Sequence, residues 1–253
     1  MNLILLDAGE VRDAGEATLS GPRARHLLSV LHVRHGQTVR IGIVDGPFGS
    51  GTVTSTSTDA VTLRCVFDAE IPAPPPVDLL LALPRPKVMR RLWAQLAALG
   101  VRRIIVTNAE RVERNYFDTH VLSPECYRPL LVEGLQQARD TRLPLVSIHR
   151  QFKPLVEDDL DGMCGGAVRL LADPGGRTSI TEALRSPRNG TRVLLAVGPE
   201  GGWNDFERQL LQARGFRSVS MGSRTLRSDT ACVALLTLVQ SALGRVSDGT
   251  YAV

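Results

Sequence analysis

Two glycine-rich loops that lie close together in the sequence are the part of this chain most suited to binding a ligand. One loop is Gly198–Gly202 (GPEGG), directly after the apolar run Val193–Val197, and the other is Gly222–Arg227, after the short run Phe216–Met221. A short, wholly apolar run is typical of a strand buried on both faces. Because ligands of open α/β sheets bind where loops leave the carboxyl ends of strands, the two loops predict one binding site. For GPEGG alone, a plain strand-to-helix turn is the alternative, since glycine and proline are the usual turn residues.

Neither loop matches a nucleotide-binding motif. The dinucleotide fingerprint GxGxxG and the phosphate loop GxxxxGK[ST] are both absent from them, so the loops do not indicate a nucleotide-binding fold by pattern. Instead, GPEGG-W-x-x-x-E followed by MGSRTLRSDTA resembles the two signature loops of the RsmE-type methyltransferases. These enzymes of the SPOUT superfamily use S-adenosylmethionine to methylate N3 of a uridine in small-subunit (16S) ribosomal RNA. A third glycine-rich turn, in Leu170–Gly176, matches the loop that completes the cofactor pocket in SPOUT enzymes.

This resemblance implies a C-terminal α/β domain with a deep trefoil knot, and S-adenosylmethionine as cofactor. In SPOUT enzymes the knot loops bind the cofactor largely through backbone groups, which explains the need for glycine and other small residues. The residues that the resemblance assigns to the cofactor are Leu171, Gly198, Pro199, Gly201, Gly202, Met221, Gly222, Ser223 and Leu226.

The chemistry that the resemblance implies needs a base and a cation. Uridine N3 is mostly protonated at neutral pH, so its methylation requires removal of a proton and stabilisation of charge on the flanking carbonyl oxygens. Asp229 is the candidate base and Arg227 the candidate cation. The alternatives are that Asp229 only stabilises the start of a helix and that Arg227 only pairs with a carboxylate such as Glu200. The family more often has Thr-Glu where this chain has Ser228-Asp229.

Positive charge is concentrated in one stretch of the chain. The net charge of the protein is +4, yet residues 85–114 hold eight basic and two acidic residues, a net charge of +6. Such a stretch indicates a phosphate-binding face, although a solvated helix face is the alternative because 28 of the 30 basic residues are arginine. The predicted RNA-binding residues are Arg85, Lys87, Arg90, Arg91, Arg111 and Arg114.

The elements that must position these loops divide into two predicted domains. Residues 1–70 hold short candidate strands separated by turns, which favours a small β-barrel, and they resemble the PUA-like, RNA-binding N-terminal domain of the RsmE family. The predicted elements there are strands Leu3–Leu6, Gln37–Val44, Gly51–Ser57 and Ala60–Phe67, and a helix over 21–31. Residues 71–76, with four prolines, predict an extended linker.

From residue 77 to 253, strands alternate with helices, which predicts a parallel α/β sheet. The apolar stripe Met89, Leu92, Trp93 and Leu96 predicts a helix that packs one face on this sheet. The expected strands are Asp78–Leu83, Arg103–Thr107, Leu143–Ile148, Val168–Ala172, Val193–Val197 and Ser218–Met221. The expected helices cover about 86–99, 124–139, 178–185, 203–214 and 228–243.

The remaining expectations concern partners and location. The helix over 228–243 is apolar nearly all round, so it must be buried on more than one face, and SPOUT relatives use it at a two-fold interface; a homodimer is expected. The four cysteines lack metal spacing, no signal peptide or membrane span is evident, and a cytoplasmic protein without metal is expected. Ribosomal RNA or the small ribosomal subunit is the expected partner. A SPOUT enzyme with another target, such as the ribose 2′-oxygen, and a non-catalytic RNA-binding relative are the alternatives.

Overall fold

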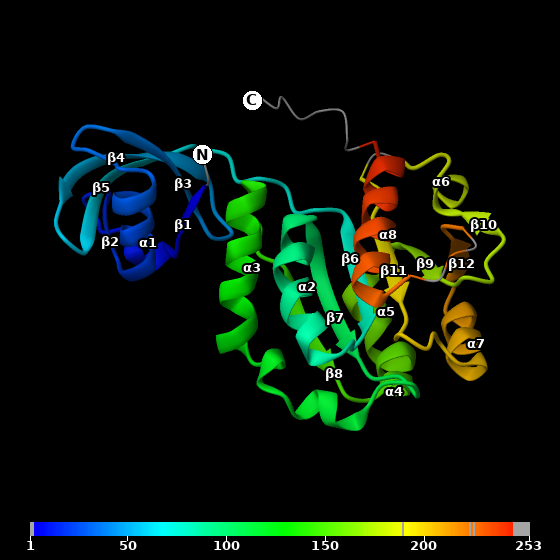
Figure 1. Ribbon diagram of the computed structural model, residues 1–253. Helices are drawn as coiled ribbons and strands as arrows, with labels where there is room; N and C mark the ends of the chain where they lie inside the picture. Colours follow the sequence, from blue (N-terminus) through cyan, green and yellow to red (C-terminus); the bar gives the residue numbers. More distant parts are fainter. Residues whose placement is uncertain (1–2, 189, 223, 225, 245–253) are drawn as a thin grey trace. The chain divides into compact units, whose positions relative to one another are not determined.

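The computed structural model describes residues 3–188, 190–222, 224 and 226–244 (Figure 1). The chain divides into two compact units, each built on its own β-sheet. The first unit consists of Met1–Pro74 and Val132–Leu143, and the second consists of Pro75–Leu131 and Pro144–Val253.

The first unit contains a five-stranded mixed sheet in which only the β1–β3 pair is parallel. Inward residues such as Val39, Ile41 and Leu63 are buried and alternate with more exposed neighbours, as expected of a sheet with one covered face. In sheet order, its strands are β1 (Ile4–Leu6), β3 (Thr38–Ile43), β4 (Phe48–Thr56), β5 (Ala60–Phe67) and β2 (Glu16–Ser20).

A segment from the middle of the chain completes this first unit. Thr141 is fully buried, and its hydroxyl donates to the Gly46 carbonyl at 2.7 Å. The backbone N–H of Asp45 donates to the Thr141 carbonyl at 2.7 Å, and the Asp45 carboxylate accepts from the Leu143 N–H at 3.1 Å. These bonds explain why residues 132–143 belong to the first unit, which the linear sequence does not reveal.

The second unit contains a seven-stranded sheet whose neighbouring strands are all parallel. The expected parallel α/β sheet is therefore confirmed. In sheet order, its strands are β10 (Thr178–Ser179), β12 (Arg217–Ser220), β9 (Val168–Ala172), β11 (Val193–Val197), β6 (Val77–Ala82), β7 (Val101–Thr107) and β8 (Leu145–His149).

Helices α2 (Pro86–Ala98) and α8 (Ser228–Ala242) pack side by side against this sheet (Figure 1). The predicted apolar stripe of α2 is confirmed, since Met89, Leu92, Trp93 and Leu96 are all fully buried. The Trp93 indole N–H donates to the Val121 carbonyl at 3.0 Å, which satisfies its polar atom inside the core. In the described part of the chain, the remaining α-helices of four or more residues are α1 (Gly21–Arg25), α3 (Pro124–Ala138), α5 (Leu160–Cys164), α6 (Ile180–Ala183) and α7 (Asp205–Ala213).

Several predicted elements were wrong in extent. The helix expected over 178–185 is a two-residue strand, β10, followed by the short helix α6, because Ser179 caps that helix by accepting from the Glu182 N–H at 3.1 Å. The helix expected over 21–31 is α1 followed by one turn of π-helix at His26–Val30. Strand β2 and the helical stretch that begins with α4 (Phe152–Pro154) were not predicted.

One buried ion pair lies where β6 and β11 begin. Asp78 is fully buried, and its Oδ2 accepts from Arg192 Nη2 at 2.6 Å. Burial, together with the Asp78 carboxylate to which the thiol donates, raises the pKa of the neighbouring Cys164 thiol to about 11. Among the described residues, Arg192 is the cation that forms an ion pair with the Asp78 carboxylate.

We expect Arg192→Met to destabilise the protein, because it leaves a buried carboxylate without its cation. Breaking a buried pair costs about 3 kcal/mol, and the partial exposure of Arg192 argues against a larger value. Urea unfolding measures the change. Arg188→Met is the control, since the Arg188 side chain is exposed and has no partner among the described residues. Equal unfolding midpoints for both variants would contradict the role of the pair.

Candidate functional site

A cavity of about 350 Å³ lies where β9, β11 and β12 end. Its wall includes Ala172, Val197 and Ser220, which are the last residues of these strands. Most of the remaining wall comes from the loops that follow the strands and from α8: Asp173 and Pro174; Gly198 to Trp203; Met221, Gly222, Arg224 and Leu226; and Ser228, Ala231 and Leu235. Val219 of β12, Arg208 of helix α7 and Arg111 complete the wall. The carboxyl ends of parallel strands thus build one concave site, as expected of an open α/β sheet.

The loop after β11 is held by two arginines from the second unit. The Arg111 guanidinium donates to the Gly201 carbonyl, and Arg85 Nε lies 3.0 Å from Glu200 Oε2. A Cβ atom on Gly201 would stand 2.9 Å from Arg111 Cδ, so only glycine allows this approach. Gly202 has φ +73° and closes a turn by donating to the Pro199 carbonyl at 2.8 Å, a conformation that also favours glycine.

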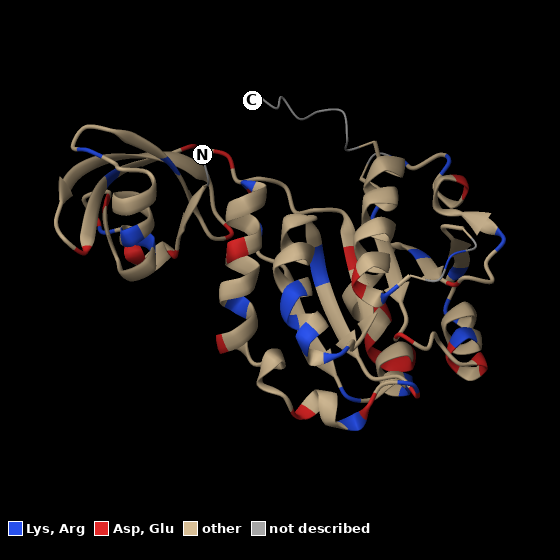
Figure 2. Ribbon diagram, in the orientation of Figure 1, with Lys and Arg blue, Asp and Glu red and all other residues tan. Residues whose placement is uncertain are grey.

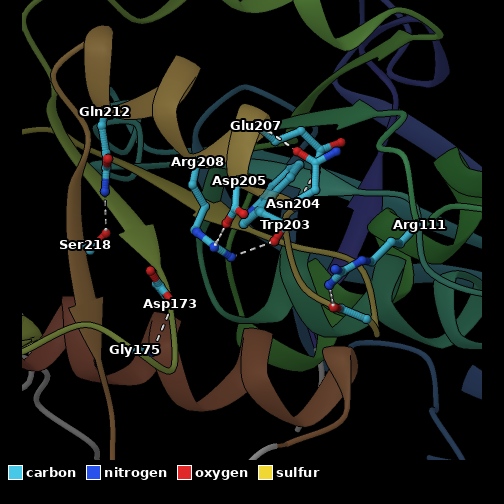
Figure 3. Close-up of polar contacts among 11 residues, drawn as sticks. Arg111, Asp173, Gly175, Trp203, Asn204, Asp205, Glu207, Arg208, Gln212 and Ser218 are labelled. Carbon is cyan, nitrogen blue, oxygen red and sulfur yellow. Dashed lines mark hydrogen bonds and ion pairs between the residues drawn. The ribbon is translucent and has the colours of Figure 1, made fainter.

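The start of α7 fixes the other side of this loop (Figure 3). Asn204 caps the helix by accepting from the Glu207 N–H at 2.8 Å, and Glu207 accepts in return from the Asn204 N–H at 2.8 Å. The second oxygen of Glu207 accepts from the Glu110 N–H at 2.7 Å, and the side chain is only 3% exposed. One buried carboxylate therefore ties α7 to the segment that carries Arg111.

Trp203 contributes an unsatisfied polar atom to the cavity wall. Its indole ring packs against Phe152 with ring centroids 5.2 Å apart, and the residue is 3% exposed. Its Nε1 is buried and has no hydrogen-bond partner among the described residues. A buried N–H without a partner is rare in native proteins, so this atom is available to a ligand.

Most of the predicted cofactor residues come together in this cavity. Gly198, Pro199, Gly201, Gly202, Met221, Gly222 and Leu226 all line it. Leu171 is fully buried in β9 and is not among the lining residues, although the next residue, Ala172, is. Ser223 lies outside the described residues.

The two predicted catalytic residues lie beside the cavity rather than in its wall. Arg227 precedes α8, and Asp229 is in its first turn, on either side of the lining residue Ser228. Asp229 Oδ2 accepts from Arg91 Nη2 at 3.0 Å. This hydrogen bond holds the pKa of the Asp229 carboxyl below its ordinary value. Arg227 is exposed, and Glu200, its alternative partner, pairs with Arg85 instead.

The predicted RNA-binding residues lie on α2 and on the segment after β7, where Figure 2 shows a run of blue residues along α2. Arg85, Arg91 and Arg111 contact the cavity loops and α8, as described above. Arg90 Nη1 lies 4.0 Å from Cys126 Sγ, and Lys87 and Arg114 are exposed with no partner among the described residues. Arg111 also lines the cavity, so it belongs to the candidate site itself.

The sequence motif GPEGG-W-x-x-x-E includes Trp203 and Glu207, but the sequence analysis gave neither of them a role in the site, and it did not place Arg111 at the cavity. The spacing Asn-x-x-Glu at 204–207 is a capping-box signal and could have identified Glu207. Nothing in the sequence pairs Arg111 with Gly201, because that contact depends on two adjacent loops of the folded sheet.

Comparisons with known proteins define the class to which this fold and cavity belong. Residues 72–240 match the family model described as an RNA methyltransferase domain. The ribosomal RNA small subunit methyltransferase E of Treponema pallidum is 31% identical over 94% of this chain and 90% of its own length. The methyltransferase E 1 of Borreliella burgdorferi is 22% identical over 96% of this chain and 99% of its own.

A solved structure has the same fold. The ribosomal RNA small subunit methyltransferase E of Neisseria gonorrhoeae, determined bound to S-adenosyl methionine, superimposes with a TM-score of 0.74. It covers 95% of this chain and 97% of its own length at 21% identity. The chain belongs to the ribosomal RNA small subunit methyltransferase E family of RNA methyltransferases.

The described part of the chain contains neither a membrane-spanning helix nor a metal-binding cluster of side chains. None of its helices is both long enough and apolar enough to cross a lipid bilayer. Within the same residues, no group of three or more His, Cys, Asp and Glu side chains could hold a metal ion.

We expect Glu207→Ala to destabilise the protein by about 2–3 kcal/mol, because it leaves the N–H groups of Asn204 and Glu110 without their acceptor. Thermal unfolding monitored by circular dichroism measures the change. Glu182→Ala, which removes an exposed acid from the first turn of α6, is the control and should cost only about 0.5 kcal/mol. Similar losses for both variants would show that Glu207 acts only as a helix cap.

Proposed function

We propose that this protein methylates N3 of a uridine in 16S ribosomal RNA and uses S-adenosylmethionine as the methyl donor. The observation that carries the proposal is the cavity formed by three loops at the carboxyl ends of β9, β11 and β12 in a chain of the methyltransferase E family. The relatives named above are named as methyltransferases of small-subunit ribosomal RNA, and the Neisseria gonorrhoeae protein was determined bound to S-adenosyl methionine.

The cavity suits such a cofactor in size and chemistry. Ligand cavities measure roughly 300–1,000 Å³ and combine apolar walls with a few polar groups, and this one measures about 350 Å³. Val197, Leu226 and Leu235 supply apolar surface, the glycine loops expose backbone groups, and Trp203 Nε1 offers an unused donor. When bound, the cofactor supplies an electrophilic methyl group.

The protein must then supply a base and charge stabilisation for the uracil ring. Asp229 and Arg227 flank Ser228 at the edge of the cavity, and we assign the base to Asp229 and the cation to Arg227. In the free protein, Arg91 lowers the pKa of Asp229, which makes the carboxylate a weaker base. A substrate phosphate that binds Arg91 would remove this effect, so the base would gain strength when RNA is bound.

The wider architecture follows the same family assignment. Residues 1–70 would form a PUA-like RNA-binding barrel, 71–76 the linker, and 77–253 the SPOUT domain with its trefoil knot, except that 132–143 belong to the compact unit of the barrel. The arginines of α2 would bind RNA phosphates. Ribosomal RNA in the cytoplasm, free or in the small subunit, would be the substrate.

We expect the purified protein, given S-adenosylmethionine and small-subunit ribosomal RNA, to form 3-methyluridine, which nucleoside mass spectrometry detects. Asp229→Asn should slow the reaction by about a hundredfold to ten-thousandfold, because it removes the base but keeps its size. Calorimetry should show unchanged cofactor affinity. Methylation at the ribose instead of N3 would refute the proposed specificity, and an unimpaired variant would refute the role of Asp229.

Because Arg91 lowers the pKa of Asp229, we also expect the pH dependence of methylation to change when Arg91 is replaced. Arg91→Ala should let the pKa of Asp229 rise from its lowered value toward the ordinary value of about 4. The base must be ionised to act, so activity should be lost at a higher pH on the acid side than in the wild type. KM for RNA should rise while kcat at neutral pH does not fall. A reduced kcat with unchanged KM would mean that Arg91 positions the base rather than binding RNA.

We also propose a homodimer that uses α8. One face of α8 is buried within the chain, but Leu238 remains 37% exposed beside a groove that Met221, Gly222 and Leu226 share with the cofactor cavity. Sedimentation should therefore give twice the chain mass of 27.5 kDa. Leu238→Glu should produce a monomer, whereas Leu145→Glu, at an exposed leucine of β8, should not. A wild-type monomer would overturn the proposal.

A further inference from the structure

We propose that a second cavity, at the opposite end of the same strands, binds backbone phosphates of the RNA substrate. This cavity has a volume of about 400 Å³ and lies where β9, β11 and β12 begin. Its wall includes Val168, the first residue of β9, and Arg217, the first residue of β12. The choice of RNA as the source of phosphate rests on the proposed function.

The position of this cavity separates it from the cofactor site. Strand β11 runs from Val193, beside the lining residue Arg192, to Val197, which lines the cofactor cavity. Five residues of strand span about 16 Å, so the two cavities lie at opposite ends of the same strands, one at the amino ends and one at the carboxyl ends. A ligand in one cavity therefore leaves the other accessible.

Charge is the distinguishing feature of the second cavity. Arg188, Arg192 and Arg217 line it, and none of its described lining residues is acidic. The sequence around it has the same bias, since residues 185–192 contain three arginines and no acid. Such a concentration of positive charge at one concave surface favours an anionic ligand.

The donors of these arginines are only partly used. Arg192 Nη2 is engaged by Asp78, but its Nε is buried without a partner among the described residues. Arg217 Nη2 donates to a neutral group, the Ala183 carbonyl, at 2.9 Å, so its charge is not neutralised there. Arg188 is exposed, and its guanidinium has no partner in the described part of the chain, since only its backbone carbonyl accepts hydrogen bonds, from Thr191.

The chemistry of this wall fits phosphate. A guanidinium presents a planar fork of donors that matches two phosphate oxygens, and several forks along one surface match the repeated phosphates of a nucleic acid backbone. Arg185, Arg188 and Arg217 are all exposed and lie on neighbouring segments, as required for contact with successive phosphates. A long RNA could engage this surface while its target uridine occupies the cofactor side.

The test compares the salt dependence of RNA binding for the wild type, Arg188→Ala and Arg217→Ala. Fluorescence anisotropy with full-length small-subunit ribosomal RNA should give a slope of log affinity against log salt that is smaller by about one unit in each variant. Lys153→Ala is the control. It removes one exposed positive charge from α4, next to β8 at the far edge of the sheet, and should leave the slope unchanged.

Two further measurements identify the role and the source of the phosphate. S-adenosylmethionine affinity by calorimetry, and the affinity for a short uridine-containing RNA, should be the same in wild type and variants, since neither ligand reaches the second cavity. Unchanged slopes with full-length RNA would overturn the proposal, and so would Arg188-dependent binding of inorganic pyrophosphate without any change in RNA slope. Because slopes report binding alone, they remain decisive even if the wild type methylates another position.

Discussion

The burial of strand β11 on both faces is the constraint on which the rest of the second unit depends. Its residues Val193 to Val197 are at most 3% exposed, and its backbone pairs with β9 on one side and β6 on the other. A strand covered in this way can present functional groups only through the loops at its two ends. The segment 185–192, which holds three arginines, therefore precedes β11, and the glycine loop Gly198–Gly202 follows it. The two segments lie at opposite ends of one buried strand.

At the carboxyl ends of the strands, arginines hold the cavity loops and α8 through solvent-exposed ion pairs, whose acidic partner another anion can replace. Arg85 and Arg91 are 64% and 60% exposed, and each pairs with an acid of the site, Glu200 or Asp229. Exposed ion pairs contribute little to stability, typically about 0–1 kcal/mol, because water and salt screen them. In the proposed RNA complex, a phosphate would replace either acid at small cost, whereas the buried carboxylate of Asp78 at the other end of the strands keeps its pairing with Arg192.

The elements that could be predicted from the sequence are those whose pattern is local. Strand β11 was recognised because its apolar run is continuous, and β6 and β9 because each is apolar apart from one charged residue, Asp78 or Arg169. Helix α2 was recognised because its apolar stripe repeats with helical spacing. Strand β2 was missed because only Ala17 and Leu19 of its five residues are buried, a pattern too short to stand out. The glycine loops were recognisable for the same local reason, since their residue types alone indicate close backbone approach.

What could not be predicted depends on distant partners. Arg111 and Gly201 are 90 positions apart, Arg91 and Asp229 are 138 apart, and Thr141 and Gly46 are 95 apart. These pairs meet only in the folded chain, where the order of strands in the sheets differs from their order in the sequence, and no local propensity encodes such contacts. The residues that bind were therefore easier to identify from sequence than the residues that hold them in place.

The positive charge of the chain is concentrated in two separate segments of the sequence. Residues 85–114 carry +6 and residues 185–192 carry +3, which together exceed the +4 of the whole chain, so the remaining residues carry −5. A uniform charge of +4 on a chain of this size would attract any polyanion weakly and without orientation. Two separated basic segments on an otherwise acidic chain orient a long polyanion, because both are satisfied only when the backbone follows the path between them. A short RNA that reaches only one basic segment would gain the contacts of that segment but not this orientation.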